Sequence, residues 1–337
     1  MKKIFQPIIM SVTTASLFSV HPVHAQQIEM AKYDSNYIRI YPEKFGLRIL
    51  ASQKYASLNL PSAVDGHDLH YHANPKLNFG VGGSYKNVSL NLTLGVGYLS
   101  NNDIGKTKGI DFQIHFTPYK WEIDLLTSFH KGNYLSPKGY LSANPEKYYY
   151  RPDVKLDLIG IAAYRVANPQ RFSPAAALTQ TVWQIKSAGS FLYGGEANYG
   201  LLKGDSSVFP PNSVHDINSK KVNKIEFINV GVGIGYAYTL VIEKYYFISG
   251  SIIGNVDLNT TIEDALQGNK TKTNIGASAI YKAAIGYNSG EWSISGNVSG
   301  NALTANHINS SKDYIYNSGM FRLSLAKKIN VKHSKSM

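Results

Sequence analysis

The sequence has 337 residues, with 34 Lys or Arg against 22 Asp or Glu, which gives a formal net charge of +12 at pH 7. It contains no cysteine, which excludes a disulfide framework and thiolate metal sites. Tyrosine outnumbers phenylalanine by 24 to 13, and tyrosine suits the boundary between an apolar phase and water.

The first 25 residues show the three-part pattern of a secretory signal peptide. Lys2 and Lys3 form a basic start, residues 8–20 are mostly apolar, and residues 23–25 (VHA) form a small-x-small cleavage site. The apolar part is too short, and too interrupted by Ser and Thr, to span a bilayer as a helix. We therefore expect export and cleavage after Ala25. An exported protein rarely meets nucleic acid, so anionic lipid or lipopolysaccharide explains the basic surplus better.

After a lead-in at residues 26–43, expected to be periplasmic, the chain alternates apolar residues with small or polar ones. Residues 77–85 and 88–98 follow this period of two, with Lys86-Asn87 between them as a two-residue hairpin turn. Such alternation is typical of strands with one apolar face. The same pattern predicts strands at 110–116, 121–130, 225–240, 245–256, 275–287, 292–302 and 315–325. No convincing helical period follows the signal peptide, so the sequence predicts an all-β chain.

The lengths of strands and loops favour an antiparallel up-and-down transmembrane β-barrel over a soluble sandwich or lipocalin-like barrel. The predicted strands exceed those of a usual sandwich, and aromatic residues lie near the ends of their apolar faces, as in membrane girdles. Short turns alternate with long connections, as in outer-membrane barrels. The expected long connections are 59–75, 100–108, 131–154, 203–223, 257–271 and 303–313.

This rhythm predicts about 12 strands within a barrel at residues 44–328, followed by a basic tail at 329–337. The stretch Arg171–Lys203 must make an odd number of crossings and is too long for one simple strand. Three crossings there would give 14 strands. The pattern is compatible both with an open lumen and with a plugged one.

Two glycine-rich stretches invite comparison with phosphate-binding loops. Residues 80–86 (GVGGSYK) lack the spacing of a P-loop, and residues 231–236 (GVGIGY) lack the last glycine of a dinucleotide-binding motif. Neither is followed by a helix, which phosphate binding requires. We expect no cofactor. These glycines are expected on the polar face, where they let strands bend or leave room for bulky groups in the lumen; they are Gly80, Gly82, Gly95, Gly97, Gly231, Gly233 and Gly235.

The hairpin at 110–130 has the richest set of ionisable residues on its inward face. A turn at 119–120 sets three pairs opposite one another: Thr117–Glu122, His115–Asp124 and Asp111–Ser128. Ionisable groups inside a membrane protein are functional candidates. A hydrogen-bonded network that fills a narrow barrel is favoured over a proton- or ligand-handling site in which Asp124 poises His115 near neutral pH. The predicted lumen cluster is Asp111, His115, Glu122 and Asp124.

Two sets of residues are candidates for other chemistry. Ser128 and His130, with Asp111 adjacent, resemble the arrangement in outer-membrane lipid A deacylases, but they are predicted to face the lumen and not the lipid. The segment DGHDLHYHAN (65–74) contains His67, His70 and His72, which could bind Zn²⁺ or Cu²⁺. Polar loop residues are the favoured interpretation, and no metal site is predicted. The sequence does not decide whether the protein is an enzyme; a non-enzymatic protein is favoured.

Several stretches resemble a known family. They are YDSNYI (33–38), LRILASQKYASLNL (47–60), TPYKWEIDLLTSFHKGNYL (117–135) and NPQRFSPAAALTQTVWQIKSAGSFLYGG (168–195). The family is domain of unknown function 4421, exported barrel proteins of Bacteroidota bacteria, and the resemblance covers Tyr33 to about Tyr287. It implies an outer-membrane location and brings no activity, substrate or catalytic residues. Many barrels end on an aromatic residue, whereas this chain continues past Leu325 into a basic tail.

The leading functional prediction is an outer-membrane barrel of structural, transport or interaction type. One alternative is an enzyme acting on envelope lipid through Ser128 and His130. Another is a barrel subunit of an envelope or secretion assembly, with 131–154 and 203–223 as partner surfaces. The expected partners are outer-membrane lipid and lipopolysaccharide, the barrel-assembly machinery and a candidate envelope protein, with no nucleic acid.

Overall fold

A computed structural model describes residues 32–331 with internal gaps. The gaps are 42, 62–67, 76, 86–87, 97–103, 141, 143, 210–220, 266–267 and 309–311. The predicted signal peptide, the Lys86-Asn87 turn and the end of the tail lie outside the described residues. Within the strands, the side chains of residues 88, 95–96, 110–113 and 265 are also outside them.

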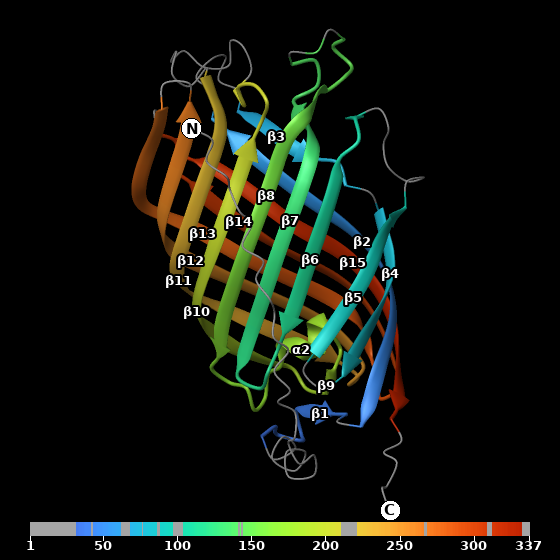
Figure 1. Ribbon diagram of the computed structural model, residues 1–337. Helices are drawn as coiled ribbons and strands as arrows, with labels where there is room; N and C mark the ends of the chain where they lie inside the picture. Colours follow the sequence, from blue (N-terminus) through green and yellow to red (C-terminus); the bar gives the residue numbers. More distant parts are fainter. Residues whose placement is uncertain are drawn as a thin grey trace, which may run out of the picture.

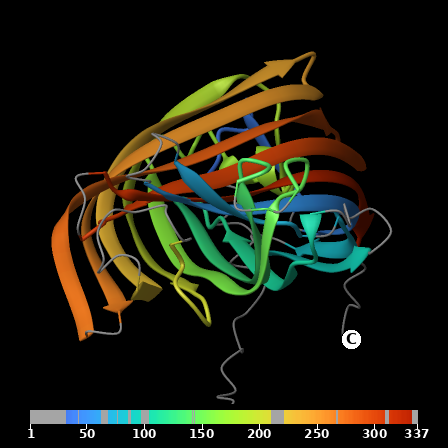
Figure 2. The same cartoon turned by 90° about the horizontal axis from the view of Figure 1, so that it is seen from above.

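The described chain is all-β, and its long strands close into an antiparallel barrel (Figures 1 and 2). Twelve described strands form the ring, each beside its neighbours in sequence, and the last pairs with the first. They are β2 (Lys44–Leu60), β4 (Leu77–Tyr85), β5 (Val88–Val96), β6 (Lys108–Phe116), β7 (Trp121–Ser136), β8 (Tyr149–Val166), β10 (Ala188–Lys203), β11 (Val222–Ile242), β12 (Tyr246–Ala265), β13 (Gly268–Asn288), β14 (Trp292–Ala305) and β15 (Tyr314–Asn330). The predicted count of 12 is confirmed.

The alternative count of 14 strands is wrong, because Arg171–Lys203 contributes β10 as its one crossing. The rest of this stretch holds the five-residue helix α2 (Pro174–Leu178) and the short strand β9 (Val182–Gln184). Strand β9 pairs with β1 (Ile38–Ile40) in a separate two-stranded sheet. Helix α2 was not predicted, because five residues are too few to show a helical period. No described helix is long and apolar enough to cross a membrane.

The barrel has two different ends. The turn end carries the short connections 117–120, 243–245 and 289–291, the start of β2 and the end of β15. The loop end carries the longer connections, among them 137–148 and 306–313. In Figure 1 the turn end lies at the bottom, beside β1, β9 and α2.

Strands extend farther toward the loop end than the sequence predicted. The long connection expected at 257–271 is wrong, because β12 and β13 continue in register as far as the pair Ala265–Gly268. Likewise, β7 and β8 take up parts of the predicted connection 131–154. At the opposite, turn end, β15 runs two residues past the predicted limit at 328. Residues 259–264 do not alternate regularly between apolar and polar, so the sequence pattern did not predict a strand there.

Over the middle of the barrel, polar side chains face inward and apolar side chains face outward. Asn229, Asp257 and Asn259 are at most 1% exposed, whereas Leu92 and Leu94 are 74% and 80% exposed. A water-soluble protein buries its apolar residues, so this arrangement excludes the alternative of a soluble sandwich or lipocalin-like barrel.

Toward the loop end the arrangement reverses. On β8, Leu156 and Leu158 are fully buried, and the outward positions beside them are Lys155 and Asp157; the outward positions become apolar at Ile159. The inward side chains here form an apolar core in the barrel interior. Its largest members are Tyr71, Phe209, Phe227, Tyr314, Tyr316, Leu58, Leu60, Leu69, Leu135, Leu156, Leu158, Leu202, Leu303 and Ile225.

Polar side chains of neighbouring strands fill the space left by inner-wall glycines. A Cβ atom at Gly231 would lie 1.8 Å from Oδ1 of Asp257, and one at Gly233 would lie 1.8 Å from Oδ1 of Asn255. Gly82 has the same relation to Asn91, at 2.2 Å. The expectation that such glycines make room for bulky groups is confirmed at these positions.

The wall is weakest between β5 and β6. Among the described residues these strands share only the pairs Val88–Phe116 and Ser89–His115, whereas β4 and β5 pair along their full lengths and β6 pairs with β7 along the whole of β6. Figure 1 shows β5 and β6 diverging toward the loop end. There, a further short strand, β3 (Leu69–Ala73), pairs with both β2 and β7.

Candidate functional site

The lumen contains, toward the turn end, a buried cluster of charged groups from three strands. The register pairs His115 with Asp124 and Asp111 with Ser128, as predicted. His115 Nδ1 hydrogen-bonds to Asp124 Oδ1, and Lys282 Nζ of β13 donates to both Glu122 and Asp124. The side chains of Lys282 and Glu122 are only 6% and 3% exposed. We call Lys282, Glu122, Asp124 and His115 the lumen ion cluster.

Sequence analysis missed Lys282, which is central to the lumen ion cluster. It lies 158 and 160 residues from its two partners along the chain and contacts them across the barrel interior. Strand periodicity shows that Lys282 faces inward but does not show which inward residues meet it. The predicted member Asp111 has its side chain outside the described part of the structure.

A cavity of about 70 Å³ adjoins this cluster, room for a few water molecules. Polar residues supply much of its lining, including Asp124, Ser128, Glu196, Asn198 and Lys282. These residues come from β7, β10 and β13, so the cavity lies within the lumen.

At the turn end, a segment that we call the plug (residues 171–187) folds back against the barrel wall. Arg48 Nη2 donates to the carbonyl of Thr179, and Arg322 Nη2 donates to that of Leu178 at 3.4 Å. Both guanidinium groups thus lie at the C-terminal end of α2, where orphan carbonyls favour positive charge. Ala177 packs against Phe247 and Ala284 of the wall.

Further hydrogen bonds fix the second half of the plug. Trp183 Nε1 donates to the carbonyl of Lys244 at 2.7 Å, and Asn288 Nδ2 donates to that of Val182 at 3.0 Å. The plug is therefore held by β2, β13 and β15 and by the turn between β11 and β12.

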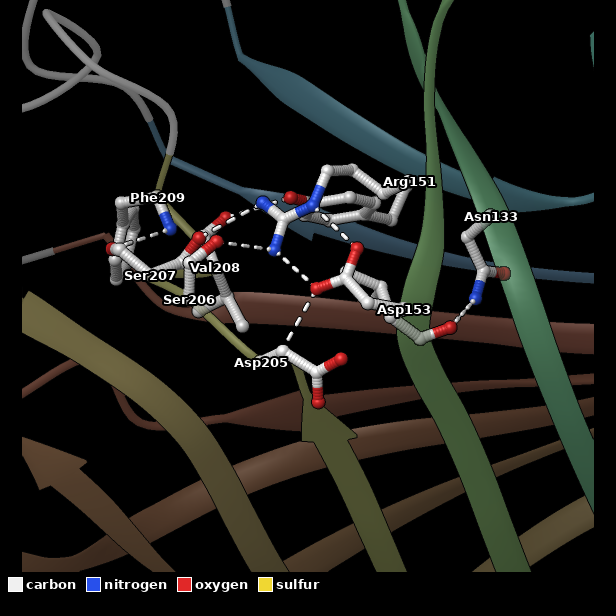
Figure 3. A network of polar contacts seen from close by, with 10 residues as sticks. Asn133, Arg151, Asp153, Asp205, Ser206, Ser207, Val208 and Phe209 are labelled. Atoms are coloured by element: carbon white, nitrogen blue, oxygen red, sulfur yellow. Dashed lines mark hydrogen bonds and ion pairs between the residues drawn. The ribbon is translucent and has the colours of Figure 1, made fainter.

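At the loop end, residues 204–209 are fixed by Arg151 of β8 (Figure 3). Arg151 forms a bidentate pair with Asp153, with N–O distances of 2.8 and 2.7 Å. Its Nη1 also donates to the carbonyl of Ser207 at 2.9 Å, and Asp153 accepts the backbone N–H of Asp205 at 3.0 Å. The next two residues, Val208 and Phe209, are buried in the apolar core.

The candidate catalytic pair lies close together in the lumen. Ser128 Oγ is 3.1 Å from His130 Nδ1, and both side chains are buried. The backbone N–H of His130 donates to Asp157 Oδ1 at 3.2 Å. The side chains of Ser128 and His130 both face inward, as the sequence predicted.

The candidate metal-binding histidines have other partners. His70 Nδ1 lies 2.6 Å from Asn59 Oδ1, and His72 Nε2 lies 3.0 Å from Ser136 Oγ. Their ring centroids are 6.0 Å apart. His67 lies outside the described residues. Across the described part of the chain, no three His, Cys, Asp or Glu side chains form a group suited to a metal ion.

Residues 32–326 match the family described as Domain of unknown function (DUF4421). The chain belongs to that family. None of the curated proteins that were compared matches this DUF4421 member.

Several solved structures are similar to this DUF4421 chain at low sequence identity. The outer membrane protease OmpT from Escherichia coli is 9% identical with a TM-score of 0.39, covering 86% of this chain and 97% of its own. The toluene transporter TodX of P. putida is 6% identical with a TM-score of 0.29, covering 87% and 91%. The attachment invasion locus protein Ail of Yersinia pestis is 10% identical with a TM-score of 0.20, covering 85% and 99%.

Proposed function

We propose that the protein is an outer-membrane β-barrel with an occluded lumen, which acts as a structural or binding protein of the envelope and not as an open diffusion pore. The turn end would face the periplasm and the loop end the exterior. The observation that carries this proposal is the combination of an apolar outer band with closure of both ends.

The outer band has the height that a bilayer requires. On β11, the outward positions from Ile228 to Ile242 are apolar or aromatic. At a rise of about 3.3 Å per residue and a tilt of about 40°, this stretch spans about 35 Å along the axis, against a hydrocarbon core of roughly 30 Å. Lys224 and Glu226, joined at 2.6 Å, mark the loop-end limit of the band.

The occlusion rests on two different closures. The plug obstructs the turn end through Arg48 and Arg322, and the apolar core with residues 204–209 fills the loop end. Such a barrel would contact lipid and lipopolysaccharide through its outer face. Like other outer-membrane barrels, it would need the barrel-assembly machinery for insertion.

Single-channel recording on protein refolded into planar bilayers tests this proposal. We expect no steady conductance from the wild-type protein over a wide voltage range. Stable open-channel steps in the wild type would contradict it, as would recovery of the protein in the soluble fraction of its host's envelope.

Lipid-ester hydrolysis is a second candidate function, favoured by the 3.1 Å contact of Ser128 with His130. In this reaction Ser128 Oγ would attack an ester carbonyl while His130 takes its proton, and His130 would return that proton to the departing alcohol. Water would then hydrolyse the acyl-enzyme, which releases the acid and restores the serine hydroxyl. Mass spectrometry of lipid A from cells with and without the protein tests it, with Ser128→Ala as the matched control. An acyl pattern that is the same in all samples would refute it.

A further inference from the structure

Two buried carboxylates lie near one another on the inner wall, and one of them, Glu196, lines the same cavity as Asp124 and Lys282 of the lumen ion cluster. Glu196 of β10 and Asp257 of β12 both pair with Gly231 of β11, which lies between them. Asp257 Oδ1 lies 1.8 Å from the position that a Cβ of Gly231 would take. The Asp257 carboxylate therefore lies over the glycine, on the side toward Glu196.

The surrounding polar groups are already fixed. Ser278 Oγ of β13 donates to Glu196 Oε1, and Asn255 Nδ2 donates to that serine oxygen at 3.1 Å. Tyr164 in turn donates to Asn255 Oδ1 at 2.7 Å. Because a serine hydroxyl has a single proton, Ser278 has none left for Asp257.

Asp257 is consequently a buried carboxylate without compensation. It is 1% exposed, and neither of its side-chain oxygens has a hydrogen-bond partner. No Lys, Arg or His among the described residues forms an ion pair with Asp257 or Glu196. Lys282, which lines the same cavity as Glu196, binds Glu122 and Asp124. An uncompensated buried charge costs several kcal/mol, so a carboxylate that stays ionised in such a place is paired with a cation or binds a metal ion.

We propose that Asp257 and Glu196 bind a hard divalent cation of the calcium class. The carboxylates would supply the charge, and Ser278 Oγ and Asn255 Oδ1 each keep a free lone pair that can add a neutral oxygen ligand. A set made only of oxygens is the type that Ca²⁺ and Mg²⁺ prefer. Ca²⁺ suits it better, because its flexible geometry tolerates ligands from a rigid wall.

The site would join three strands of a part of the wall that bends enough for β10 and β13 to meet. The Ser278–Glu196 hydrogen bond bridges β10 and β13, with two strands between them in the sheet. A cation between Asp257 and Glu196 would add a second cross-link over the same bend, beside Gly231. This role goes beyond the proposed function, since it does not depend on whether the lumen conducts.

Equilibrium dialysis with radioactive Ca²⁺ tests the site in full-length protein refolded in detergent free of lipopolysaccharide, which itself binds Ca²⁺. We expect about one tightly bound Ca²⁺ per chain, lost in Asp257→Asn and weakened at least tenfold in Glu196→Gln. Glu263→Gln is the matched control, because Glu263 is equally buried but bonded to Tyr314 and to the backbone of Ile308; it should bind Ca²⁺ as the wild type does.

The shift of the unfolding midpoint caused by Ca²⁺ gives a second readout, in which each protein is compared with itself. A hundredfold excess of Ca²⁺ over its dissociation constant should raise the unfolding midpoint of the wild type and of Glu263→Gln by about 5–10 °C. It should leave Asp257→Asn unchanged. Absence of bound Ca²⁺ in the wild type, or full binding by Asp257→Asn, would overturn the proposal.

Discussion

Replacing Lys282 by Met should be one of the most destabilising single changes in the barrel. Lys282 is the only described cation paired with Glu122, and both side chains are almost fully buried. Asp124 would still have His115, so the larger penalty falls on Glu122. Removing one partner of a buried ion pair typically costs 3–5 kcal/mol, and we expect a loss of about 4 kcal/mol in the free energy of unfolding.

Urea unfolding of the protein refolded into lipid vesicles, followed by tryptophan fluorescence, measures this loss. The double variant Lys282→Met/Glu122→Gln should recover to within about 2 kcal/mol of the wild type, because neutral replacement of both partners removes the uncompensated charge. Lys270→Met, at an exposed position of β13, should change stability by under about 0.5 kcal/mol. A Lys282→Met variant within about 1 kcal/mol of the wild type would refute the reasoning, as would a double variant no more stable than the single one.

Three further changes test other parts of the structure. Gly231→Ala should lower the free energy of unfolding by about 1–3 kcal/mol in the same urea assay, because the added Cβ would meet the Asp257 side chain. Gly254→Ala should be nearly neutral, because an added Cβ there has no heavy atom within 4 Å. Equal effects of the two substitutions would contradict this account. Arg48→Ala/Arg322→Ala should loosen the plug and expose residues 171–187 to protease added at the turn end; an unchanged digestion pattern would argue against the capping role. Arg151→Met should likewise expose residues 204–209 at the loop end, and protection equal to that of the wild type would show that Arg151 does not fix this segment.

The ring itself could be predicted from sequence because a membrane barrel repeats one simple pattern. Alternation fixes which residues of a strand share a face, and short turns fix the register of hairpins, so His115 was correctly placed opposite Asp124. The same reasoning failed at 257–271, where the strands continue without a regular apolar face and are held by their backbone ladder.

Contacts across the lumen could not be predicted, because the local sequence pattern of a strand does not show which residues of distant strands it meets. The partners of Lys282 and the bridge from Ser278 to Glu196 depend on how sharply the wall bends. The plug also left no periodic signal, since its helix is one turn long and its buried residues follow no strand pattern. The length of the stretch between β8 and β10 was the sequence feature that indicated an additional element there.

The insertion of β3 makes the number of strands around the barrel differ between its two ends. Around the turn end the wall has the twelve described ring strands, but around the loop end β3 alone bridges β2 and β7 in place of β4, β5 and β6, which leaves ten. Barrel diameter grows roughly in proportion to strand number. At the loop end, side chains such as Tyr71, Phe227 and Tyr316 can therefore approach from different parts of the wall, and Val208 and Phe209 of the inserted segment complete the apolar core. The turn end, with more strands around it, holds the longer plug.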